Sequence, residues 1–494
     1  MKKMWKLLLN RITIALIFAL LQIALFIWMI YYLSSFWQWN LIFIIISVAI
    51  LLFLLSREDN PTYTIAWIIP IILFPVVGGA FYLLYRRRNI KPSDRDRHLE
   101  LERNRNYFLK AMEEPLSTKE ADYLKNMGWP SYKNTATTYL PSGEAMLTQV
   151  LKDIYQARHF ILMEFFIIKP SHMWTKISDA LKQKATDGVE VRVVVDDFGG
   201  RELTLSMQKE LRDFGIKIYR FNPLKIRLNF ANNYRSHRKV VVIDNKFGYV
   251  MGNNIGDEYI NLTRPLGHWV DTGTRIEGEA VWSLTLMALD TISFISNETM
   301  DYHRYYYEYS TKQSKGMIIP FGDTPLDKEE VTKNVYMSLI YSAKHSIRIT
   351  TPYLIIDPEF KHALRLAAKS GVEVAIIIPA IPDKSIVYMV TKSHLPILMK
   401  DGINIYTYTP GFMHAKMMIV DETRAMIGSA NLDYRSLYLH FENSIYLHDT
   451  ACIPTMSEHF ETLREASYLL KERDQDPMHI RMIQLILRLF ASMM

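Results

Sequence analysis

The chain repeats one pattern of helices and strands, and this duplication constrains its fold more than any other feature. From about Tyr139, and again from about Met317, an amphipathic helix leads into an apolar strand. In both copies a second helix ends at a glycine, Gly188 or Gly371, before a run of valine and isoleucine. Helices that alternate with buried apolar strands are typical of layered α/β domains. We therefore predict an α/β fold made of two similar sandwich domains.

The chain of 494 residues has room for this pair and for further segments, because single cores rarely grow beyond about 250 residues. Residues 296–316, between the two copies, are rich in tyrosine and fit either an interdomain connection or a loop on the substrate side. The C-terminal helix fits either packing on a domain or a place in a membrane interface. The predicted segments are a membrane-spanning region (1–88), a juxtamembrane linker (89–136), the first α/β domain (137–295), the connecting loop (296–316), the second α/β domain (317–475) and an amphipathic C-terminal helix (476–494).

Three apolar stretches near the N-terminus have the length of membrane segments. Ile12–Leu33, Trp39–Leu55 and Thr64–Tyr85 each approach the ~20 residues that a helix needs to cross a bilayer. A signal peptide followed by core helices is the alternative, but no small-residue cleavage site comes after the first stretch. Three arginines at 86–88 favour the cytoplasmic side for the chain beyond them. We predict a multi-pass protein of the cell membrane with cytoplasmic α/β domains, and the number of full crossings stays open.

Only two of the 14 histidines have a lysine two positions later and an aspartate seven positions later. Each motif occupies the same place in its repeat, and an asparagine follows each aspartate after ten residues. Such a paired spacing is specific, because chance rarely produces it even once. The first set is His237, Lys239 and Asp244 with Asn254, and the second is His414, Lys416 and Asp421 with Asn431.

These residue types suit phosphodiester chemistry. On a strand, residues i and i+2 point to the same face, so we expect each histidine to project together with its lysine. Two facing copies would bring two imidazoles, two ammonium groups and two carboxamides to one point. Ammonium and amide N–H groups stabilise phosphoryl oxygens, so Asn254 and Asn431 are candidate phosphate ligands. One imidazole can attack phosphorus, and the other can protonate the leaving oxygen.

The composition excludes several other chemistries. Cys452 is the only cysteine, so the sequence offers neither an internal disulfide nor a multi-cysteine metal site. It contains no His-Glu-x-x-His motif and no glycine-rich loop of the kind that cradles a nucleotide phosphate. We expect no metal and no other cofactor. A net charge of +7 favours an anionic partner, either nucleic acid or acidic lipid.

The two motif regions resemble those of the phospholipase D superfamily, and in particular those of bacterial cardiolipin synthases. They read RSHRKVVVIDNKFGYVMGNNIGDEY and MHAKMMIVDETRAMIGSANLDYRSLYLHFEN. The resemblance implies that Asp271 and Glu442 orient the two histidines. It also implies that Asp244 and Asp421 hold their motifs together rather than act as bases. The sequence departs from the family pattern at Met251, where glycine is common.

The resemblance further implies a phosphatidyltransferase that converts two phosphatidylglycerol molecules into cardiolipin and glycerol. A phosphohistidine on His237 would be the intermediate, with His414 as the general acid, and an anionic phospholipid in a membrane would be the partner. The motifs alone do not identify the acceptor, so another phosphatidyltransferase or a hydrolytic phospholipase D is the alternative. A nuclease and a non-catalytic scaffold are less favoured, because a polymer substrate needs no bilayer site and both motifs are intact. We therefore expect no nucleic-acid partner, and the sequence leaves the oligomeric state open.

Overall fold

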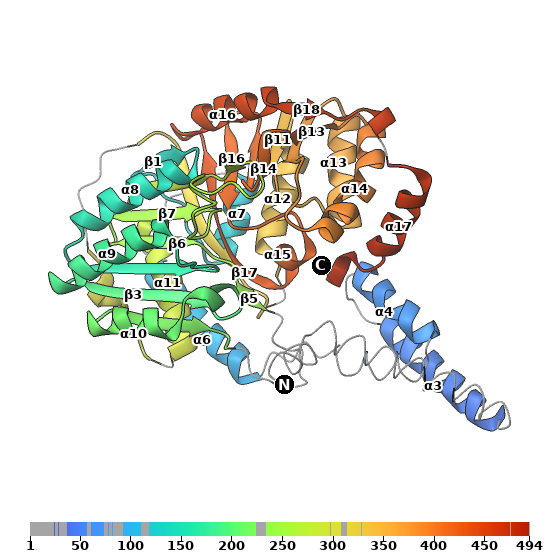
Figure 1. Cartoon of the computed structure of the whole chain (residues 1–494), viewed down its shortest axis with the longest axis horizontal. Helices are drawn as coiled ribbons and strands as arrows, with labels where there is room; N and C mark the ends of the chain where they lie inside the picture. Colours follow the sequence, from blue (N-terminus) through green and yellow to red (C-terminus); the bar gives the residue numbers. More distant parts are fainter. Residues whose placement is uncertain are drawn as a thin grey trace. The chain divides into compact units, whose positions relative to one another are not determined.

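The computed structural model describes residues 24, 28, 37–56, 61–73, 78, 82, 92–109, 118–223, 234–296, 298–307, 314–327, 329–474 and 476–493. The chain divides into two compact units. The first comprises Met1–Asn89 and Leu228–Ala231, and the second comprises Ile90–Arg227 and Asn232–Met494. Both predicted α/β domains belong to the second unit (Figure 1).

The first unit contains two apolar helices, α3 (Trp37–Leu55) and α4 (Pro61–Leu73). They pack through a small apolar cluster that includes Leu54 and Trp67. These helices fall on the second and third apolar stretches of the sequence. The first stretch lies outside the described residues, apart from residues 24 and 28. In the part of the chain that the structure describes, no helix combines the length and the apolar character needed to cross a membrane.

The first α/β domain is built on a seven-stranded sheet in the order β1-β9-β7-β6-β2-β3-β4. Strands β2, β3 and β4 run parallel, and the other neighbours are antiparallel. Alternate residues of β2 face opposite sides, so Ile161 packs in one core cluster and Leu162 in another. Burial on both faces explains why these strands are apolar throughout. The strands are β1 (Thr135–Leu140), β2 (Phe160–Phe165), β3 (Glu190–Asp196), β4 (Lys217–Phe221), β6 (Val240–Ile243), β7 (Phe247–Met251) and β9 (Gly273–Gly278).

Helices cover both faces of this sheet. Residues of three helices pack on one face, whereas α11 contributes to the core on the other. Ser142 and Ser171 begin α8 and α9, because each hydroxyl accepts a backbone N–H of the first turn. Gly188 follows α9 with φ of +90°, which glycine adopts without strain. The helices are α8 (Gly143–Gln156), α9 (His172–Thr186), α10 (Leu205–Asp213) and α11 (Val281–Ser296).

The second α/β domain repeats this topology. Its sheet follows the order β10-β17-β16-β15-β11-β12-β13-β18, in which β18 (Ser467–Leu469) is an added edge strand. Figure 1 shows the first domain from teal through green to yellow and the second from gold to red. The other strands are β10 (Met317–Asp323), β11 (Ser346–Thr350), β12 (Glu373–Pro379), β13 (Asn404–Tyr408), β15 (Met417–Val420), β16 (Arg424–Gly428) and β17 (His440–His448). Its main helices are α12 (Val331–Ser342), α13 (Pro358–Lys369), α14 (Ser385–Lys400) and α16 (Ile453–Glu465).

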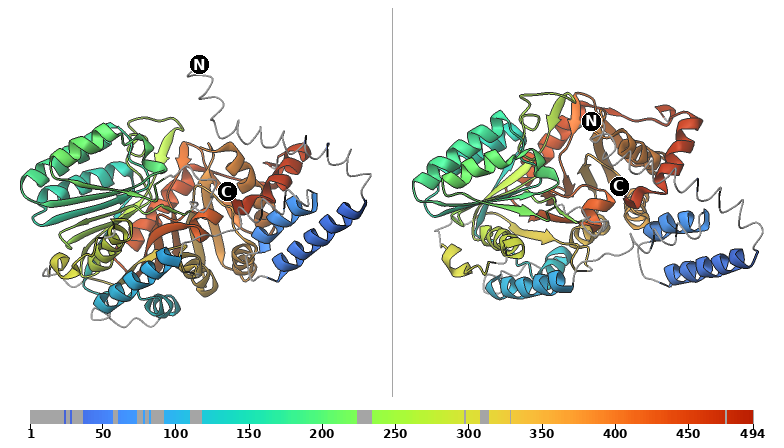
Figure 2. Two further views of the ribbon diagram at one scale, coloured as in Figure 1. Left: turned by 90° about the horizontal axis from the view of Figure 1, so that it is seen from below. Right: turned by 60° about the horizontal axis from the view of Figure 1, so that its bottom comes forward.

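One short strand of each domain crosses to pair with a strand of the other domain. Strand β5 (Arg235–Ser236) pairs in parallel with β17 of the second domain. Strand β14 (Gly411–Met413) pairs in parallel with β8 (His268–Val270) of the first domain. The two domains lie side by side in all views (Figure 2). Since β5 and β14 each end directly before a motif histidine, this exchange carries both histidines to the boundary between the domains.

The segments predicted as linker and connecting loop pack on the same core. Helix α6 (Pro92–Leu109) contacts α11, where Arg105 forms a 3.0 Å ion pair with Asp290. Helix α7 (Lys119–Asn126) contacts α12. In the connecting loop, Tyr302 is buried and its hydroxyl donates to Asp290. These contacts fit an interdomain connection better than a loop on the substrate side.

The segment predicted as an amphipathic C-terminal helix (476–494) contains helix α17 (Met478–Arg488). It contacts α14 and buries Gln484. Met478, Met482 and Ile486 are each more than half exposed. Packing on the domain and an exposed apolar face therefore occur together in this helix.

Candidate active site

Each motif histidine is fixed to the other domain by its backbone. The N–H of His237 donates to the carbonyl of Phe441 at 2.9 Å, and the N–H of His414 donates to the carbonyl of Val270 at 2.8 Å. The histidine and lysine of each motif lie in the connection between a crossing strand and the main sheet, at residues 237–239 and 414–416. The expectation that both would stand on one continuous strand is therefore wrong. The crossing strand ends first, because the chain must leave one sheet to enter the other.

A carboxylate holds each imidazole. The Nδ1 atom of His237 lies 3.0 and 3.1 Å from the two carboxylate oxygens of Glu442. The Nδ1 atom of His414 lies 2.5 Å from Asp271. Each acid directly follows the residues that pair with the crossing strand, so Glu442 serves the histidine of the first domain and Asp271 that of the second. Because a carboxylate only accepts, Nδ1 carries the proton and Nε2 keeps its lone pair.

Both motif lysines are buried in the same region. The ammonium of Lys239 donates to the carbonyl of His237 at 2.5 Å, and that of Lys416 donates to the carbonyl of His414. The Lys416 ammonium also lies 2.9 Å from Nδ1 of His414. That nitrogen already donates to Asp271, so we assign the hydrogen bond of Lys416 to the carbonyl and treat the ring contact as electrostatic.

Burial dominates the electrostatics of the site. Burial, followed by the charge of Lys416, lowers the pKa of His414 to about 4. Burial and the charges of Lys239 and Lys416 lower the pKa of His237 well below its ordinary value of 6.5. Burial also lowers the pKa of Lys239 to about 7 and that of Lys416 to about 8. Both imidazoles are thus neutral at pH 7, as a nitrogen nucleophile must be.

The side chains of the two predicted phosphate-binding asparagines already have acceptors. Asn254 donates to the hydroxyl of Tyr259 at 2.8 Å, and its carbonyl accepts the N–H of Ile167 at 3.1 Å. Asn431 donates to Asp433 over a longer distance, 3.4 Å. A phosphate oxygen would have to replace these acceptors. The weaker bond of Asn431 makes that exchange easier in the second domain.

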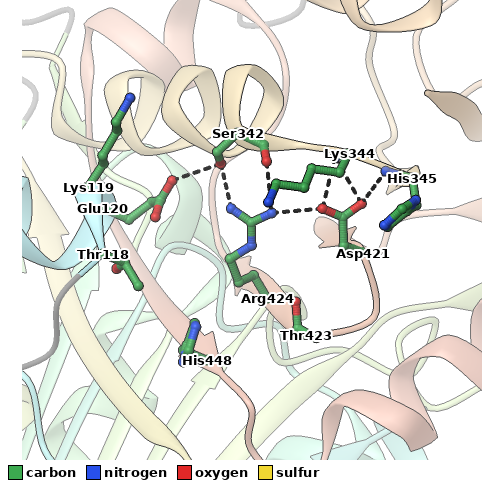
Figure 3. Close-up of a pocket in the computed structure, with 10 residues that line it drawn as sticks. All are labelled: Thr118, Lys119, Glu120, Ser342, Lys344, His345, Asp421, Thr423, Arg424 and His448. Carbon is green, nitrogen blue, oxygen red and sulfur yellow. Dashed lines mark hydrogen bonds and ion pairs between the residues drawn. The ribbon is translucent and has the colours of Figure 1, made fainter. Parts of the chain in front are cut away.

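The motif aspartates face away from the histidines. Asp244 accepts the backbone N–H groups of Arg158, His159 and Phe160 at 2.7 to 2.8 Å. Asp421 does the same for residues 344–346, and it also pairs with Arg424 at 2.9 Å (Figure 3). Burial opposes the ionised form of Asp421, but these backbone donors and Arg424 lower its pKa. Both carboxylates tie the motif strand to the start of its neighbour, which is a structural task.

A pocket lies on this outer side of the second motif rather than at the histidines. Figure 3 shows Arg424 between Asp421 and Ser342, with Lys119 and His448 nearby. The charged groups at its centre are already paired.

Sequence reasoning missed several residues that shape the site. Asn443 accepts the N–H of Lys239 at 3.0 Å. The buried guanidinium of Arg238 donates to the carbonyls of Glu442 and Asp323. Ser429 donates to Glu442, and the ring of His440 lies 5.6 Å from that of His237. All four residues lie inside or directly beside the two motif regions, so proximity to the motifs was the signal that could have found them.

Comparison with known proteins places this site in a family. A family model described as cardiolipin synthase, PLD-like domain, matches residues 150–272 and again 336–464. A cardiolipin synthase of Geobacillus sp. (strain WCH70) is 33% identical over 98% of this chain and 100% of its own length. The chain belongs to the cardiolipin synthase family of the phospholipase D superfamily. The predicted family, the enzymatic nature of the chain and its duplicated α/β sandwich fold are thereby confirmed.

Other comparisons agree with membership of this cardiolipin synthase family. A cardiolipin synthase of Alkalihalophilus pseudofirmus (strain ATCC BAA-2126 / JCM 17055 / OF4) is 36% identical over 90% of this chain and 91% of its own length. Residues 42–87 match a model described as phospholipase D-nuclease N-terminal. The crystal structure of phosphatidylserine synthase from Haemophilus influenzae Rd KW20 aligns with a TM-score of 0.59 at 15% identity. It covers 76% of this chain and 100% of that one, and this likeness concerns the fold alone.

Proposed function

We propose that this enzyme is a cardiolipin synthase, which transfers a phosphatidyl group from one phosphatidylglycerol to another and releases glycerol. The observation that carries the proposal is the pair of neutral imidazoles, each held at Nδ1 by an acid of the opposite domain. This arrangement leaves both Nε2 atoms without a proton, which suits nucleophilic and acid–base roles at a phosphodiester. The names of the relatives, which are cardiolipin synthases, support cardiolipin as the product.

The first step forms a phosphohistidine. Nε2 of His237 attacks the phosphorus of phosphatidylglycerol, and the bond from phosphorus to the glycerol oxygen breaks. His414, protonated in the complex, gives its proton to that oxygen, so glycerol leaves neutral. The bound phosphodiester is an anion and favours this protonated form against the charge of Lys416. Glu442 stabilises the positive charge that develops on His237.

The second step uses the same groups in reverse. The free hydroxyl of a second phosphatidylglycerol gives its proton to His414 and attacks phosphorus. The bond to His237 breaks, and cardiolipin leaves. One phosphodiester is exchanged for another, so no nucleotide is needed. Lys239, Lys416, Asn254 and Asn431 stabilise the phosphoryl oxygens as charge shifts between them.

An assay with a single lipid tests the function. Purified enzyme is incubated in mixed micelles with phosphatidylglycerol alone, and the products are identified by mass. Cardiolipin with equimolar glycerol supports the proposal. Phosphatidic acid alone would identify a hydrolytic phospholipase D, and products formed only after an added alcohol would identify another phosphatidyltransferase.

We also propose that the chemistry runs without a metal, because Lys239 and Lys416 neutralise the phosphate. Activity should persist after treatment with EDTA. Loss of activity in EDTA, with recovery on adding a divalent ion, would disprove this part of the mechanism.

We propose further that residues 1–88 hold the enzyme in the cell membrane, with the α/β domains in the cytoplasm. The three apolar stretches and the arginines at 86–88 support this placement. Protease added outside intact spheroplasts should leave the region 139–470 uncut, and permeabilised cells provide the control. Cleavage of that region in intact spheroplasts would reverse the orientation.

A further inference from the structure

A third histidine lies beside the His237 and Glu442 pair and has no part in the mechanism above. His440 begins β17, and its ring lies 5.6 Å from the ring of His237. Its Nδ1 atom lies 3.9 Å from Oε1 of Glu442, and its side chain is 11% exposed. Among the described residues, neither ring nitrogen of His440 has a hydrogen-bond partner.

An imidazole in such a place is unusual. A buried polar group without a hydrogen-bond partner destabilises the fold, so most such groups have one. His440 lies close enough to His237 and Glu442 for one small solute to contact all three side chains. The question is which solute both histidines and Glu442 would hold in common.

The three side chains have the donor set of a transition-metal site. One ligating atom from each of His237, His440 and Glu442 lies within 4.8 Å of the other two. Both imidazoles turn Nδ1 toward Oε1 of Glu442, at 3.0 and 3.9 Å. Zinc binds imidazole nitrogen and carboxylate oxygen at about 2.0–2.2 Å, which places tetrahedral ligands about 3.4 Å apart. Side-chain movements of about 1 Å would therefore bring all three onto one ion.

We propose that His237, His440 and Glu442 form an inhibitory site for a divalent transition metal of the zinc class. The ion takes one nitrogen from each imidazole and one oxygen from the carboxylate, and water fills the fourth position. Lys239 and Lys416 repel a dication, so the site fills when the metal is in excess and is not a resident cofactor site.

The Glu442 carboxylate and a bound metal ion have opposite effects on the ability of His237 to attack phosphorus. Glu442 accepts the proton of Nδ1 and leaves the lone pair of Nε2 for attack on phosphorus. A metal on Nδ1 uses the lone pair of that nitrogen, so the imidazole proton moves to Nε2 and attack is blocked. A metal on Nε2 blocks it directly. This consequence rests on the proposed function, whereas the binding of metal does not.

Around His414, the described residues include no comparable group of metal ligands. The residue two positions before Asp271 is Trp269, just as His440 stands two positions before Glu442. Trp269 lies 5.2 Å from His414, ring to ring, but an indole N–H only donates. One metal per chain is therefore expected.

The test uses the full-length enzyme, freed of metal by a chelator that is then removed. Cobalt is titrated and its visible absorption recorded, and zinc inhibition is measured in the phosphatidylglycerol assay. We expect one equivalent of cobalt, inhibition by zinc, and recovery in EDTA. His440→Asn should weaken both effects by at least about 10-fold, since even indirect support of a metal ligand is worth that much. His440→Gln is the second variant in case the first is unstable.

His448→Asn is the matched control, because His448 lies at the other end of the same strand. It should retain both effects. Equal zinc inhibition of the His440 variants and the wild type would overturn the site, as would the absence of cobalt binding. Cobalt binding that needs His440 but leaves activity unchanged would uphold the site and count against His237 as the nucleophile.

Discussion

The two domains position their histidines by the same exchange of strands but hold them with different acids. The first domain provides Asp271, whereas the second provides the longer Glu442. The neighbours differ accordingly. Ser429, which lies 15 positions after His414, donates to Glu442. The residue 15 positions after His237 is Gly252. A Cβ atom at Gly252 would lie 2.2 Å from Asp271, so no serine fits there.

This difference shows that a duplicated scaffold need not give two equivalent sites. The backbone of each half repeats closely, down to the aspartate that anchors each motif. The acids, their supports and the aromatic or histidine neighbours do not repeat. Different tasks for His237 and His414 are therefore reasonable, and each domain depends on the other for one acid.

The largest effect should come from the histidines themselves. His237→Ala and His414→Ala should each lower the turnover of phosphatidylglycerol by on the order of 10⁴-fold or more, because attack and leaving-group protonation are both required. A phosphatidyl ester of p-nitrophenol separates the two roles, since its leaving group is stable as an anion. His414→Ala should then release a burst of p-nitrophenolate and trap phosphate on His237, and His237→Ala should give no burst.

The reverse pattern would exchange the two roles and keep the two-histidine mechanism. A burst from neither variant would contradict a simple division of labour between the domains.

Sequence alone predicted the duplication and the motif residues because both are local patterns. It did not predict how the strands cross, since β5 pairs with a strand about 200 residues away and pairing at that distance leaves no local trace. Nor did it predict that Asn254 donates to Tyr259, or that His440 lies beside His237. Asp271 and Glu442 were named only through the resemblance to a family, because nothing in a strand end marks an acid as the partner of a distant histidine.

The next largest effect should come from the two acids that hold the histidines of the opposite domain. Glu442→Gln and Asp271→Asn should each lower turnover by about 10²- to 10⁴-fold, because an amide no longer fixes the proton on Nδ1. With the p-nitrophenyl ester, Glu442→Gln should weaken the burst while Asp271→Asn preserves it. Pre-steady-state absorbance measures both. If Asp271→Asn abolished the burst instead, Asp271 would act on His237, the histidine of its own domain, rather than on His414, which it contacts.

A smaller effect should follow from substituting the residues that lie against these two acids. Ser429→Ala removes a hydrogen bond to a buried carboxylate, worth about 1.5–3 kcal/mol, so we expect a loss of about 10- to 100-fold. The loss should appear in the burst rate. Gly252→Ala forces Asp271 to move and should slow turnover of phosphatidylglycerol without slowing the burst. Thermal unfolding of both variants provides the control for global damage. Equal effects of the two variants on the burst would mean that the domains do not divide the reaction.

The smallest effect should be a dependence of kcat/KM on pH. The ammonium groups of Lys239 and Lys416 bind the phosphate while they are protonated, and their pKa values of about 7 and about 8 lie far below the ordinary 10.5. As pH rises through this range the charges are lost, so kcat/KM, which reports the free enzyme, should fall by up to about tenfold per pH unit from about pH 7 and more steeply above about pH 8, where both lysines lose their protons. The lowered pKa of His237 keeps its imidazole neutral, and able to attack phosphorus, well below pH 6.5, so the rate should fall only at low pH.

Bound substrate sharpens this prediction, because an anionic phosphodiester favours the protonated lysines and raises their pKa. The alkaline limb of kcat should therefore lie at higher pH than that of kcat/KM. Lys239→Arg keeps a charge at every accessible pH, so its remaining limb should follow Lys416 alone and begin about one pH unit higher. Initial rates between pH 5 and pH 10, at low and at saturating phosphatidylglycerol, measure both limbs. A kcat/KM that stays flat to pH 10 would show that neither buried lysine titrates in the free enzyme, and that its two domains hold both ammonium groups charged despite their burial.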